Sequence, residues 1–405
     1  MSDGTLQTLD VTMLDDVGTG ANQLIQLDSN AKIPACSGAA ITGLSAVTKN
    51  ASDPAIATNP SGGVGTVWQN TTSGEMFICT DATAGANVWT NVGAGTGNIV
   101  PYNFQGTVAG YTIFTSGIDQ VSFTTDGNAT DVGDLTVNRG SNGGNSSTTH
   151  AYWSGGYGPG SYTPNTADVI ERMSFASKGL CVDVGNLVLH IRDQATSSNE
   201  THGWTHGGLR AVNDPSGVAR GFNHIMRFQY AASSNATDVG DLLAINARPA
   251  GHSDPANSYG YCSAGSDYTG ATKYNVIQRY AMSSSGNATD VGDLTISIYS
   301  RSGTSSTTHG YTAGCGGSAP FYNVIEKFAY GSSSNATDVG NLTGQFWGSM
   351  GVSSTTFGYS CGGGNGLAQS SNNIDKYSFS TDGNATDVGD ISAAFAPCGS
   401  QGCQV

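Results

Sequence analysis

The phrase NATDVGDLT, found at 128–136 and again at 287–295, holds several groups that could bind an ion or carry a modification. Its Asn-Ala-Thr is an acceptor sequence for N-linked glycosylation. With the residues just before it, the phrase gathers carboxylate and amide oxygens, the ligands that calcium prefers. The candidate calcium ligands are Asp126, Asn128, Asp131 and Asp134. The run lacks the glycine and the twelfth-position Glu that an EF-hand loop requires, so we expect no cofactor, and a structural role for the phrase is the competing interpretation.

The other polar residues show no catalytic signature. The sequence contains no His-Glu-x-x-His, no phosphate-binding loop, no dinucleotide fingerprint and no ordered Ser, His and Asp set. His150, His202 and His309 share one repeated position, which Tyr259 and Phe357 fill elsewhere, so we predict a packing role for them. We therefore expect a protein that is not an enzyme. Two carboxylates that meet across repeats could still hydrolyse a glycosidic bond, and this alternative stays open.

The eight cysteines do not follow the spacing of a zinc site. Cys262, Cys315 and Cys361 fall in matching strands of successive repeats, which favours small buried thiols. A disulfide between Cys398 and Cys403 is a further possibility.

The phrase is one of six related copies that divide most of the chain into repeats. Its Asp-Val-Gly core begins at Asp131, Asp183, Asp238, Asp290, Asp338 and Asp387, at spacings of 48 to 55 residues. Before each copy stands a segment of alternating apolar and polar residues, which predicts a strand with one buried face. Further upstream an aromatic residue leads into glycines, as in HGWTHGG at 202–208. A phrase used in every repeat must serve what all repeats share, so we interpret NATDVGDL as a corner whose Val132 and Leu135 point inward.

Composition and charge narrow the class of protein. Fifty-eight glycines and only 11% charged residues, with aromatic residues at regular places, are typical of all-β structure with many tight turns. The formal net charge of −15 argues against nucleic-acid binding. The first residues lack the basic and apolar regions of a signal peptide, and no apolar run is long enough to insert in a membrane. A virion protein made in the host cytoplasm and released by lysis fits these observations.

The order of aromatic strand, double glycine, variable loop, alternating strand and turn resembles the kelch repeat over about residues 102–405. The usual Trp of the last kelch strand is missing, and a regulator-of-chromosome-condensation-like propeller is the neighbouring alternative. The resemblance implies an all-β fold with a six-bladed β-propeller at 98–405. The expected blades lie near 102–147, 148–200, 201–256, 257–307, 308–355 and 356–405. A strand near Ile391–Ala396 is expected to pair with the first blade and close the ring.

The first hundred residues differ from the repeats. The segment ANQLIQLDSNAKIPACSGAAITGL at 21–44 resembles segments near the start of bacteriophage tail-fibre proteins, which are commonly trimeric. We expect residues 1–60 to be a virion-attachment and oligomerisation segment with a linker, and 61–97 to be a small three-stranded β module. Trp68, Phe77 and Trp89 are available for the core of that module.

Function is expected where the repeats differ. The loops after the glycines vary most, and in a propeller such loops gather on one face. Their candidate ligand-binding residues are Tyr157, Tyr162, Arg210, Arg220, Tyr268, Tyr274, Phe321 and Tyr322. We predict a homotrimeric tail-fibre or appendage protein that holds other virion proteins through its N-terminal segment and binds a host-surface glycan or protein. A decoration or connector protein that binds other virion proteins, and a polysaccharide depolymerase, are the alternatives.

Overall fold

The computed structural model describes residues 47–92, 102–114, 116–157, 167–210, 220–314, 316, 321–365, 370–394 and 401–405. Within these ranges every named element of secondary structure is a β-strand. No helix that is long and apolar enough to cross a membrane is found there. The chain divides into two compact units, unit 1 (Met1–Pro101) and unit 2 (Tyr102–Val405).

Unit 1 contains one four-stranded sheet in the order β1-β2-β3-β4. Its strands are β1 (Thr48–Asn50), β2 (Val67–Asn70), β3 (Met76–Asp81) and β4 (Val88–Asn91). The predicted core residues Trp68, Phe77 and Trp89 are buried together, and the two indole rings lie 5.9 Å apart. The sequence predicts three of these strands. The extra strand, β1, lies in the segment that we expect to be a linker, and it pairs in parallel with β2. Its three residues are all exposed, so they show no alternation of apolar and polar residues that would predict a strand.

Unit 2 contains six larger sheets, one for each repeat, which we name repeat sheets I to VI in chain order. Sheet I consists of β31 (Cys403–Gln404), β5 (Ala109–Phe114), β6 (Gly117–Ser122) and β7 (Thr130–Asp134). Sheet II consists of β8 (Gly143–Ser146), β9 (His150–Ser154), β10 (Val169–Ser174) and β11 (Val182–Asn186). Sheet III consists of β13 (Ala195–Ser198), β14 (His202–His206), β16 (His224–Gln229) and β17 (Thr237–Asp241).

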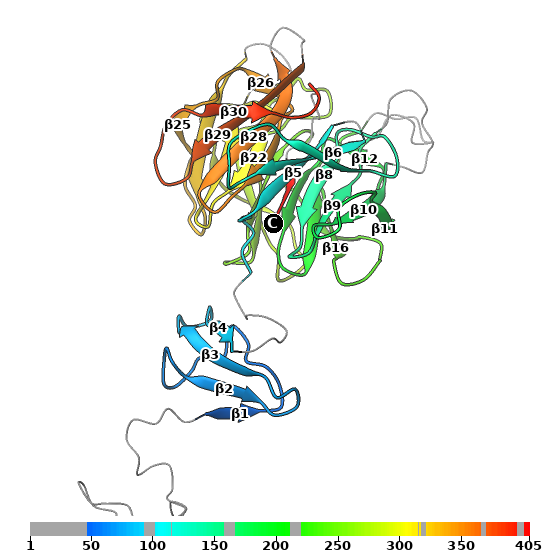
Figure 1. The fold of residues 1–405 in the computed structure, drawn as a ribbon. Coiled ribbons are helices and arrows are strands. Elements are labelled where there is room, and N and C mark those ends of the chain that lie inside the picture. The colour runs from blue at the N-terminus through cyan, green and yellow to red at the C-terminus, as the bar shows by residue number, and fades with distance from the viewer. Residues whose placement is uncertain are drawn as a thin grey trace, which may run out of the picture. The chain divides into compact units, whose positions relative to one another are not determined.

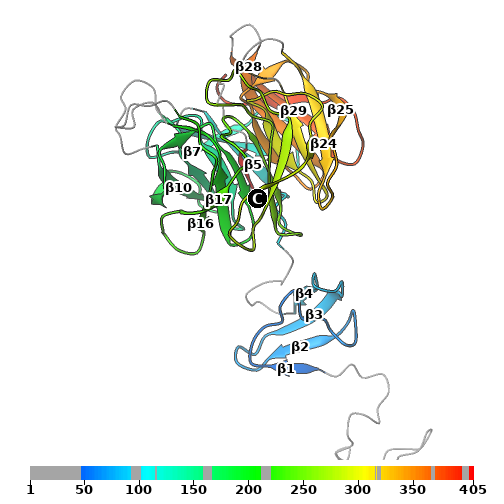
Figure 2. The ribbon, with the colours of Figure 1, turned by 180° about the vertical axis from the view of Figure 1, so that it is seen from behind.

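The remaining sheets repeat the same order. Sheet IV consists of β18 (Ala250–Asp254), β19 (Tyr259–Ser263), β20 (Val276–Ala281) and β21 (Thr289–Asp293). Sheet V consists of β22 (Ser302–Ser305), β23 (His309–Ala313), β24 (Val324–Ala329) and β25 (Thr337–Asn341). Sheet VI consists of β27 (Met350–Ser353), β28 (Phe357–Asn365), β29 (Ser370–Ser378) and β30 (Thr386–Asp390), with the short β26 (Phe346–Trp347) also paired to β28. A separate ladder joins β12 (Ile191–Arg192) to β15 (Leu209–Arg210). Figures 1 and 2 show the sheets of unit 2 lying around the C-terminus in a propeller-like arrangement.

The first strand of each sheet, which we call its axial strand, is completely buried. The axial strands are β31, β8, β13, β18, β22 and β27, and each contacts the axial strand of the next sheet. They consist largely of Gly, Ser and Thr, because neighbouring backbones approach very closely. A Cβ atom on Gly251 would lie 2.1 Å from the carbonyl oxygen of Thr196 in the preceding sheet. Small residues are therefore a requirement of this packing.

Six hydrogen bonds join the axial strands in a complete cycle. The backbone N–H of Ser146 donates to Oγ of Ser198, and the same bond follows from Ser198 to Ser253, from Ser253 to Ser305 and from Ser305 to Ser353, over 2.9 to 3.1 Å. The N–H of Ser353 donates to Oε1 of Gln404 over 3.4 Å, and the N–H of Gln404 donates to Oγ of Ser146 over 2.9 Å. The last strand of the chain thus takes the axial place in sheet I.

The strand that completes sheet I is later in the chain than we expect. Cys403 and Gln404 pair with Tyr111 and Gly110 of β5, whereas the described part of Ile391–Ala396 contains no strand. Ser392 instead donates from its backbone N–H and its hydroxyl to the carboxylate of Asp119. The expectation is wrong because CGSQGCQV, rich in Gly and polar residues, lacks the alternation of a half-buried strand, whereas an axial strand is buried on every side.

The repeated phrase forms the outermost strand of each sheet, together with a β-bulge. In sheet I, Gly133 pairs with Ile118 and Asp131 pairs with Asp119, so Val132 is an extra residue, and the same shift occurs in all six sheets. Leu135 is buried, as predicted, whereas Val132 is half-buried. The interpretation of the phrase as a corner is therefore refined to a strand that bends at its bulge.

The asparagine of the phrase joins each outer strand to the one before it. Oδ1 of Asn287 accepts a 3.0 Å hydrogen bond from the N–H of Asp241 in sheet III. Equivalent bonds run from Asn186 to Asn235, from Asp293 to Asn335, from Asn341 to Asn384 and from Asp390 to Asn128. Between sheets I and II the worn copy VDVGNL has Leu180 in place of the asparagine, and the N–H of Asp134 reaches only the carbonyl oxygen of Gly179, 3.4 Å away. The phrase is therefore a joint between sheets, and one of the six joints lacks its side chain.

Candidate functional site

The strand ends that border the variable loops lie at one end of unit 2, which we call the loop face. At this end the second strand of each sheet ends, the third begins, and the described segments that lead from one sheet to the next start. Tyr157, after β9, forms a β-bridge with Gly140, before β8, and Ser266, after β19, forms one with Ala247, before β18. The two classes of segment therefore lie side by side, because antiparallel strands bring both to the same end of their sheets.

The opposite end of the axis is filled by the start of unit 2, Tyr102–Gly106, which we call the lead-in segment. The hydroxyl of Tyr102 donates to the carbonyl oxygen of Ser146, and Nε2 of Gln105 donates to that of Ser305. The carbonyl oxygen of Phe104 accepts from Nε2 of Gln404, and Phe104 itself is 2% exposed. The lead-in segment thus contacts the final residues of axial strands from three sheets. The loop face is the end that it leaves uncovered.

The sequence-predicted ligand residues fall into three groups. Tyr157, Arg210, Arg220, Tyr268 and Tyr274 all lie on the part of the loop face built by sheets II to IV. The backbone N–H of Arg210 donates to the carbonyl oxygen of Arg220 over 2.8 Å, and Tyr268 is 49% exposed. Phe321 and Tyr322 are half-buried in the segment between β23 and β24 of sheet V. Tyr162 lies outside the described residues.

Charged and aromatic side chains form a continuous row across this part of the loop face. The row consists of Tyr157, Arg192, Asp193, Arg248, Tyr299 and Lys273, and we call it the cation–tyrosine row. The guanidinium carbon of Arg192 lies 4.9 Å from the ring centroid of Tyr157, and that of Arg248 lies 5.3 Å from the ring of Tyr299. Nζ of Lys273 is 5.8 Å from the same Tyr299 ring. Cations at these distances are attracted to the negative face of the ring.

A buried carboxylate holds the middle of the row. Oδ2 of Asp193 lies 2.6 Å from Nη1 of Arg192 and 3.5 Å from Nε of Arg248, and the Asp193 side chain is only 1% exposed. Its second oxygen, Oδ1, is buried without a hydrogen-bond partner among the described residues. One carboxylate shared by two guanidinium groups leaves a net positive charge. The two stacked rings and the shared carboxylate together fix the orientation of both arginines.

The backbone places these residues at the mouth of the axis. Ser141, Asp193, Arg248 and Ser300 have φ between +54° and +58°, two residues before their axial strands. The N–H of Arg248 donates to the carbonyl oxygen of Asp193 over 3.0 Å, and the same link joins Asp193 to Ser141 and Ser300 to Arg248. Non-glycine residues adopt this left-handed conformation only where surrounding structure demands it, at a cost of about 1 kcal/mol each. The demand here is a row of backbone hydrogen bonds that joins successive outer-to-axial crossings from Ser141 to Ser300.

Sequence reasoning misses most of the row. Arg192, Asp193, Arg248 and Tyr299 lie in the segments that lead from one sheet to the next, whereas we searched the loops after the glycines. The available signal is that Arg192, Asp193 and Arg248 are charged in a chain of which only 11% of the residues are charged.

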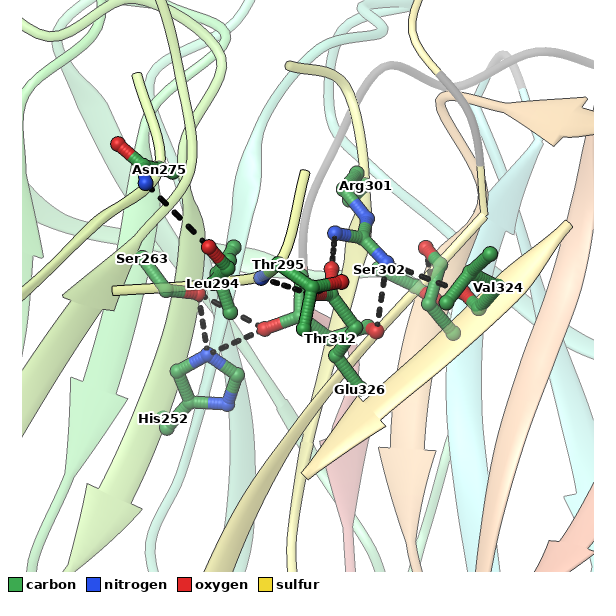
Figure 3. Close-up of polar contacts among 11 residues, drawn as sticks. His252, Ser263, Asn275, Leu294, Thr295, Arg301, Ser302, Thr312, Val324 and Glu326 are labelled. Atoms are coloured by element: carbon green, nitrogen blue, oxygen red, sulfur yellow. Dashed lines mark hydrogen bonds and ion pairs between the residues drawn. The ribbon is translucent and has the colours of Figure 1, made fainter. Parts of the chain in front are cut away.

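The other cations of unit 2 are in buried pairs or lie on or just after the third strands of their sheets. Arg139 and Arg301 are buried against Glu171 and Glu326, and Arg301 also donates to the carbonyl oxygens of Thr312 and Val324 (Figure 3). The remaining six lie on the third strands of their sheets or just after them: Arg172, Lys178, Arg227, Arg279, Lys327 and Lys376. Lys327 and Lys376 pair there with Asp382 and Asp126 of neighbouring repeats.

A second polar cluster, centred on His252, contains a histidine and a serine, as a nucleophilic catalytic site does, but it is buried. Nε2 of His252 lies 2.8 Å from Oγ of Ser263, which in turn contacts Oγ1 of Thr312, as Figure 3 shows. Nδ1 faces the carbonyl oxygen of Thr304, 3.1 Å away, so Nδ1 carries the proton and Nε2 accepts from a hydroxyl. Burial lowers the pKa of His252 to about 4, so the ring is neutral.

This cluster joins sheets and does not reach solvent. His252, Ser263, Thr304 and Thr312 are all fully buried, and no carboxylate faces Nδ1. His206 lies nearby in the same axial network through Ser197, and burial lowers its pKa to about 3. A serine and a histidine that no substrate can approach serve packing.

Two buried glutamates are likewise used within the fold. Glu326 accepts from the N–H and hydroxyl of Thr295, just after the last strand of the preceding sheet (Figure 3). Glu171 accepts in the same way from Thr136. Both side chains are fully buried against arginines. Each therefore joins two sheets at its third strand.

The candidate calcium ligands are committed to protein contacts. Oδ1 of Asn128 accepts from Asp390, Oδ1 of Asp131 accepts from the N–H of Gly133, and Asp126 pairs with Lys376. Within the described ranges no three His, Cys, Asp or Glu side chains are grouped to hold a metal ion.

The repeated histidines and the cysteines have packing contacts. His150, His202 and His309 lie 5.7 to 6.4 Å, ring to ring, from the aromatic residue two positions later, which supports the predicted packing role. Cys262 and Cys361 are buried free thiols, as is Cys403, while Cys315 and Cys398 lie outside the described residues.

Comparison with known proteins supports the fold alone. No family model matches the chain, and no curated protein matches it significantly. A solved structure described as the structure of YjhT aligns with a TM-score of 0.54 and 8% sequence identity, covering 67% of this chain and 94% of that one. At this identity the similarity is one of architecture, so the chain shares with that protein a propeller-like arrangement of β-sheets.

Proposed function

We propose that this chain is a binding protein of the bacteriophage tail-fibre or appendage type, which attaches to a host-surface glycan or protein through the loop face of unit 2. The observation that carries the proposal is the preorganised cation–tyrosine row on the end of unit 2 that the lead-in segment leaves uncovered. A rigid set of aromatic and arginine side chains on connecting segments is the usual equipment of a recognition surface. The polar residues of catalytic type that we located, by contrast, are buried in joints between sheets.

The proposal includes a closed, six-bladed propeller as the scaffold. Its support is the cycle of hydrogen bonds through Ser146, Ser198, Ser253, Ser305, Ser353 and Gln404, which returns to its starting residue. A closed ring holds the loops at fixed distances from one another, so the loop face behaves as one surface.

The virion assignment rests on the resemblance of residues 21–44 to tail-fibre segments, and a homotrimer is proposed on the same ground. In a trimer, several weak contacts to a repetitive surface would combine into strong attachment. Residues 21–44 lie outside the described residues.

The test is binding of the labelled full-length protein to a panel of bacterial cells, before and after periodate oxidation of their surface sugars. The Tyr268→Ala and Arg220→Ala variants are expected to weaken binding, because both residues are exposed on the loop face. The matched control is Lys327→Ala, which removes a cation from the third strand of sheet V. Equal binding by all variants would refute the assignment of the loop face, and no binding to any cell would refute host attachment.

A further inference from the structure

The charges of unit 2 are sorted by place. Arg139 and Arg301 are neutralised by Glu171 and Glu326 in buried pairs. The other described segments between strands at the loop face carry five cations: Arg192, Arg210, Arg220, Arg248 and Lys273. The same segments carry three aspartates, Asp168, Asp193 and Asp267, so with neutral histidines their net charge is about +2. The outer strands end beside them in Asp134, Asp241, Asp293 and Asp390, and the whole chain has a net charge of −15. The loop face thus has positive segments within a rim of aspartates.

Resting on the proposed function, we propose that the loop face selects an anionic polysaccharide, one whose sugar units carry carboxylate, sulfate or phosphate groups. A fixed guanidinium presents paired N–H donors that match the oxygens of such groups. Nε of Arg192 is buried without a partner among the described residues, so this guanidinium retains unused hydrogen-bonding capacity beside Asp193.

A place for the sugar ring lies next to the cations. Tyr268 is the only aromatic side chain among the large hydrophobic residues exposed in the described ranges. A Cβ atom on Gly221 would lie 3.2 Å from Cβ of Tyr268, so the backbone next to Arg220 is close to Tyr268. On the other side, Ser266 bridges to both Ala247 and Lys273, which brings the chain beside Arg248 near the same loop. An exposed tyrosine between cations suits a sugar ring that carries a negative group.

The charge pattern also sets the orientation of the ligand. An anionic chain is attracted to the positive segments of the loop face and repelled by the aspartates of the outer strands at its rim, so it is expected to dock toward the axis. The attraction between exposed charges is screened by salt, with a Debye length of about 8 Å at physiological ionic strength. Binding is therefore expected to weaken steeply as salt is added.

The experiment measures binding of the full-length protein to four immobilised polymers: polygalacturonate, dextran sulfate, neutral dextran and double-stranded DNA. We expect binding to at least one of the two anionic polysaccharides, weaker binding to DNA and none to neutral dextran. The Arg220→Gln and Lys273→Gln pair should weaken that binding about tenfold, since each exposed charge contact contributes modestly. Neither side chain is in a buried ion pair with Asp193, so both variants are expected to fold.

The control is the Lys327→Gln and Lys376→Gln pair, which removes the same charge from the third strands of sheets V and VI. Binding of the Arg248→Lys variant is measured as well, because this change keeps the positive charge and removes the planar guanidinium group that pairs with Asp193. Equal loss in both charge pairs, or DNA bound as tightly as the polysaccharides, would overturn the proposal as general attraction. Binding to neutral dextran that does not change with salt concentration would refute the preference for an anionic polysaccharide and leave the proposal of host attachment standing. Binding to cells without binding to any of the four polymers would have the same meaning. Absence of binding to both cells and polymers would refute both proposals.

Discussion

The joint between sheets I and II allows a direct test of the role of the repeated phrase. At the other five joints an asparagine side chain accepts a hydrogen bond of 3.0 to 3.1 Å from the neighbouring sheet, and here Leu180 replaces it. The backbone is already in place, since the N–H of Cys181 donates to the carbonyl oxygen of Asp134 over 2.8 Å, as Ala288 does to Asp241. Leu180 is 68% exposed and contributes little burial. The Leu180→Asn change should therefore complete the ring of joints.

We expect Leu180→Asn to raise the free energy of unfolding by about 1 kcal/mol, the net value of one hydrogen bond in a protein. For a unit of this size the corresponding rise in Tm is about 2 °C. The reverse change, Asn287→Leu, should lower stability by about the same amount or somewhat more, because the half-buried N–H of Asp241 loses its partner. Leu180→Ala is the control for loss of the leucine alone and should be close to neutral.

Urea unfolding of the four proteins, followed by intrinsic fluorescence, gives these differences directly. A loss in Asn287→Leu without a gain in Leu180→Asn would show that the first joint is not equivalent to the others. No change in either variant would refute the reasoning, because the asparagine bond would then contribute nothing and the conservation of the phrase along the chain would need another cause.

Three further predictions follow from the axis of unit 2. Deleting residues 401–405 should remove the axial strand of sheet I and lower Tm sharply, with faster proteolysis of the repeat region, whereas an undiminished Tm would contradict a stabilising role for β31. Gly251→Ala should destabilise by about 1–3 kcal/mol in urea unfolding, because its Cβ would lie 2.1 Å from a backbone oxygen, while Gly286→Ala, with no atom within 4 Å, serves as a neutral comparison. The pKa values of His206 and His252 fall from 6.5 in the unfolded chain to about 3 and about 4 in the fold, so the unfolded chain takes up protons first and stability should drop as pH falls from 6.5 to about 4. A variant with both histidines changed to Gln should lose less stability over that range, and an equal loss would assign the effect to other groups.

Much of unit 2 follows from the sequence because its signals are repeated. The aromatic strand and the alternating strand recur six times, and each adopts the expected β structure. The outer strand is harder to predict, since Asn, Asp and Gly favour turns, yet TDVGD is held in a sheet by hydrogen bonds from its neighbour. Its glycine is needed because a Cβ on Gly240 would lie 2.1 Å from the carbonyl oxygen of Gly286, a contact between repeats that no local pattern encodes.

The candidate site is less predictable than the fold for a similar reason. Tyr157 is identified from its variable loop, but its partner Arg192 arrives from the segment that leads to the next sheet. Asp193 joins Arg192 to Arg248 across 55 positions of sequence, a distance set by the packing of sheets. Sequence periodicity gives the frame on which these residues sit, whereas their meeting depends on how neighbouring sheets are packed.

The bulged outer strands have a consequence for crowded surroundings. Each repeat sheet ends in an open edge, and an open edge with unpaired backbone groups readily pairs with another chain. Here every such edge carries the aspartate of its Asp-Val-Gly segment and a bulge that breaks its register, and at five of the six joints an asparagine occupies a backbone donor beside it. These edges therefore repel copies of themselves. Copies of this protein are therefore expected to stay separate at a high local concentration, at which sheets with unprotected edges would pair with one another.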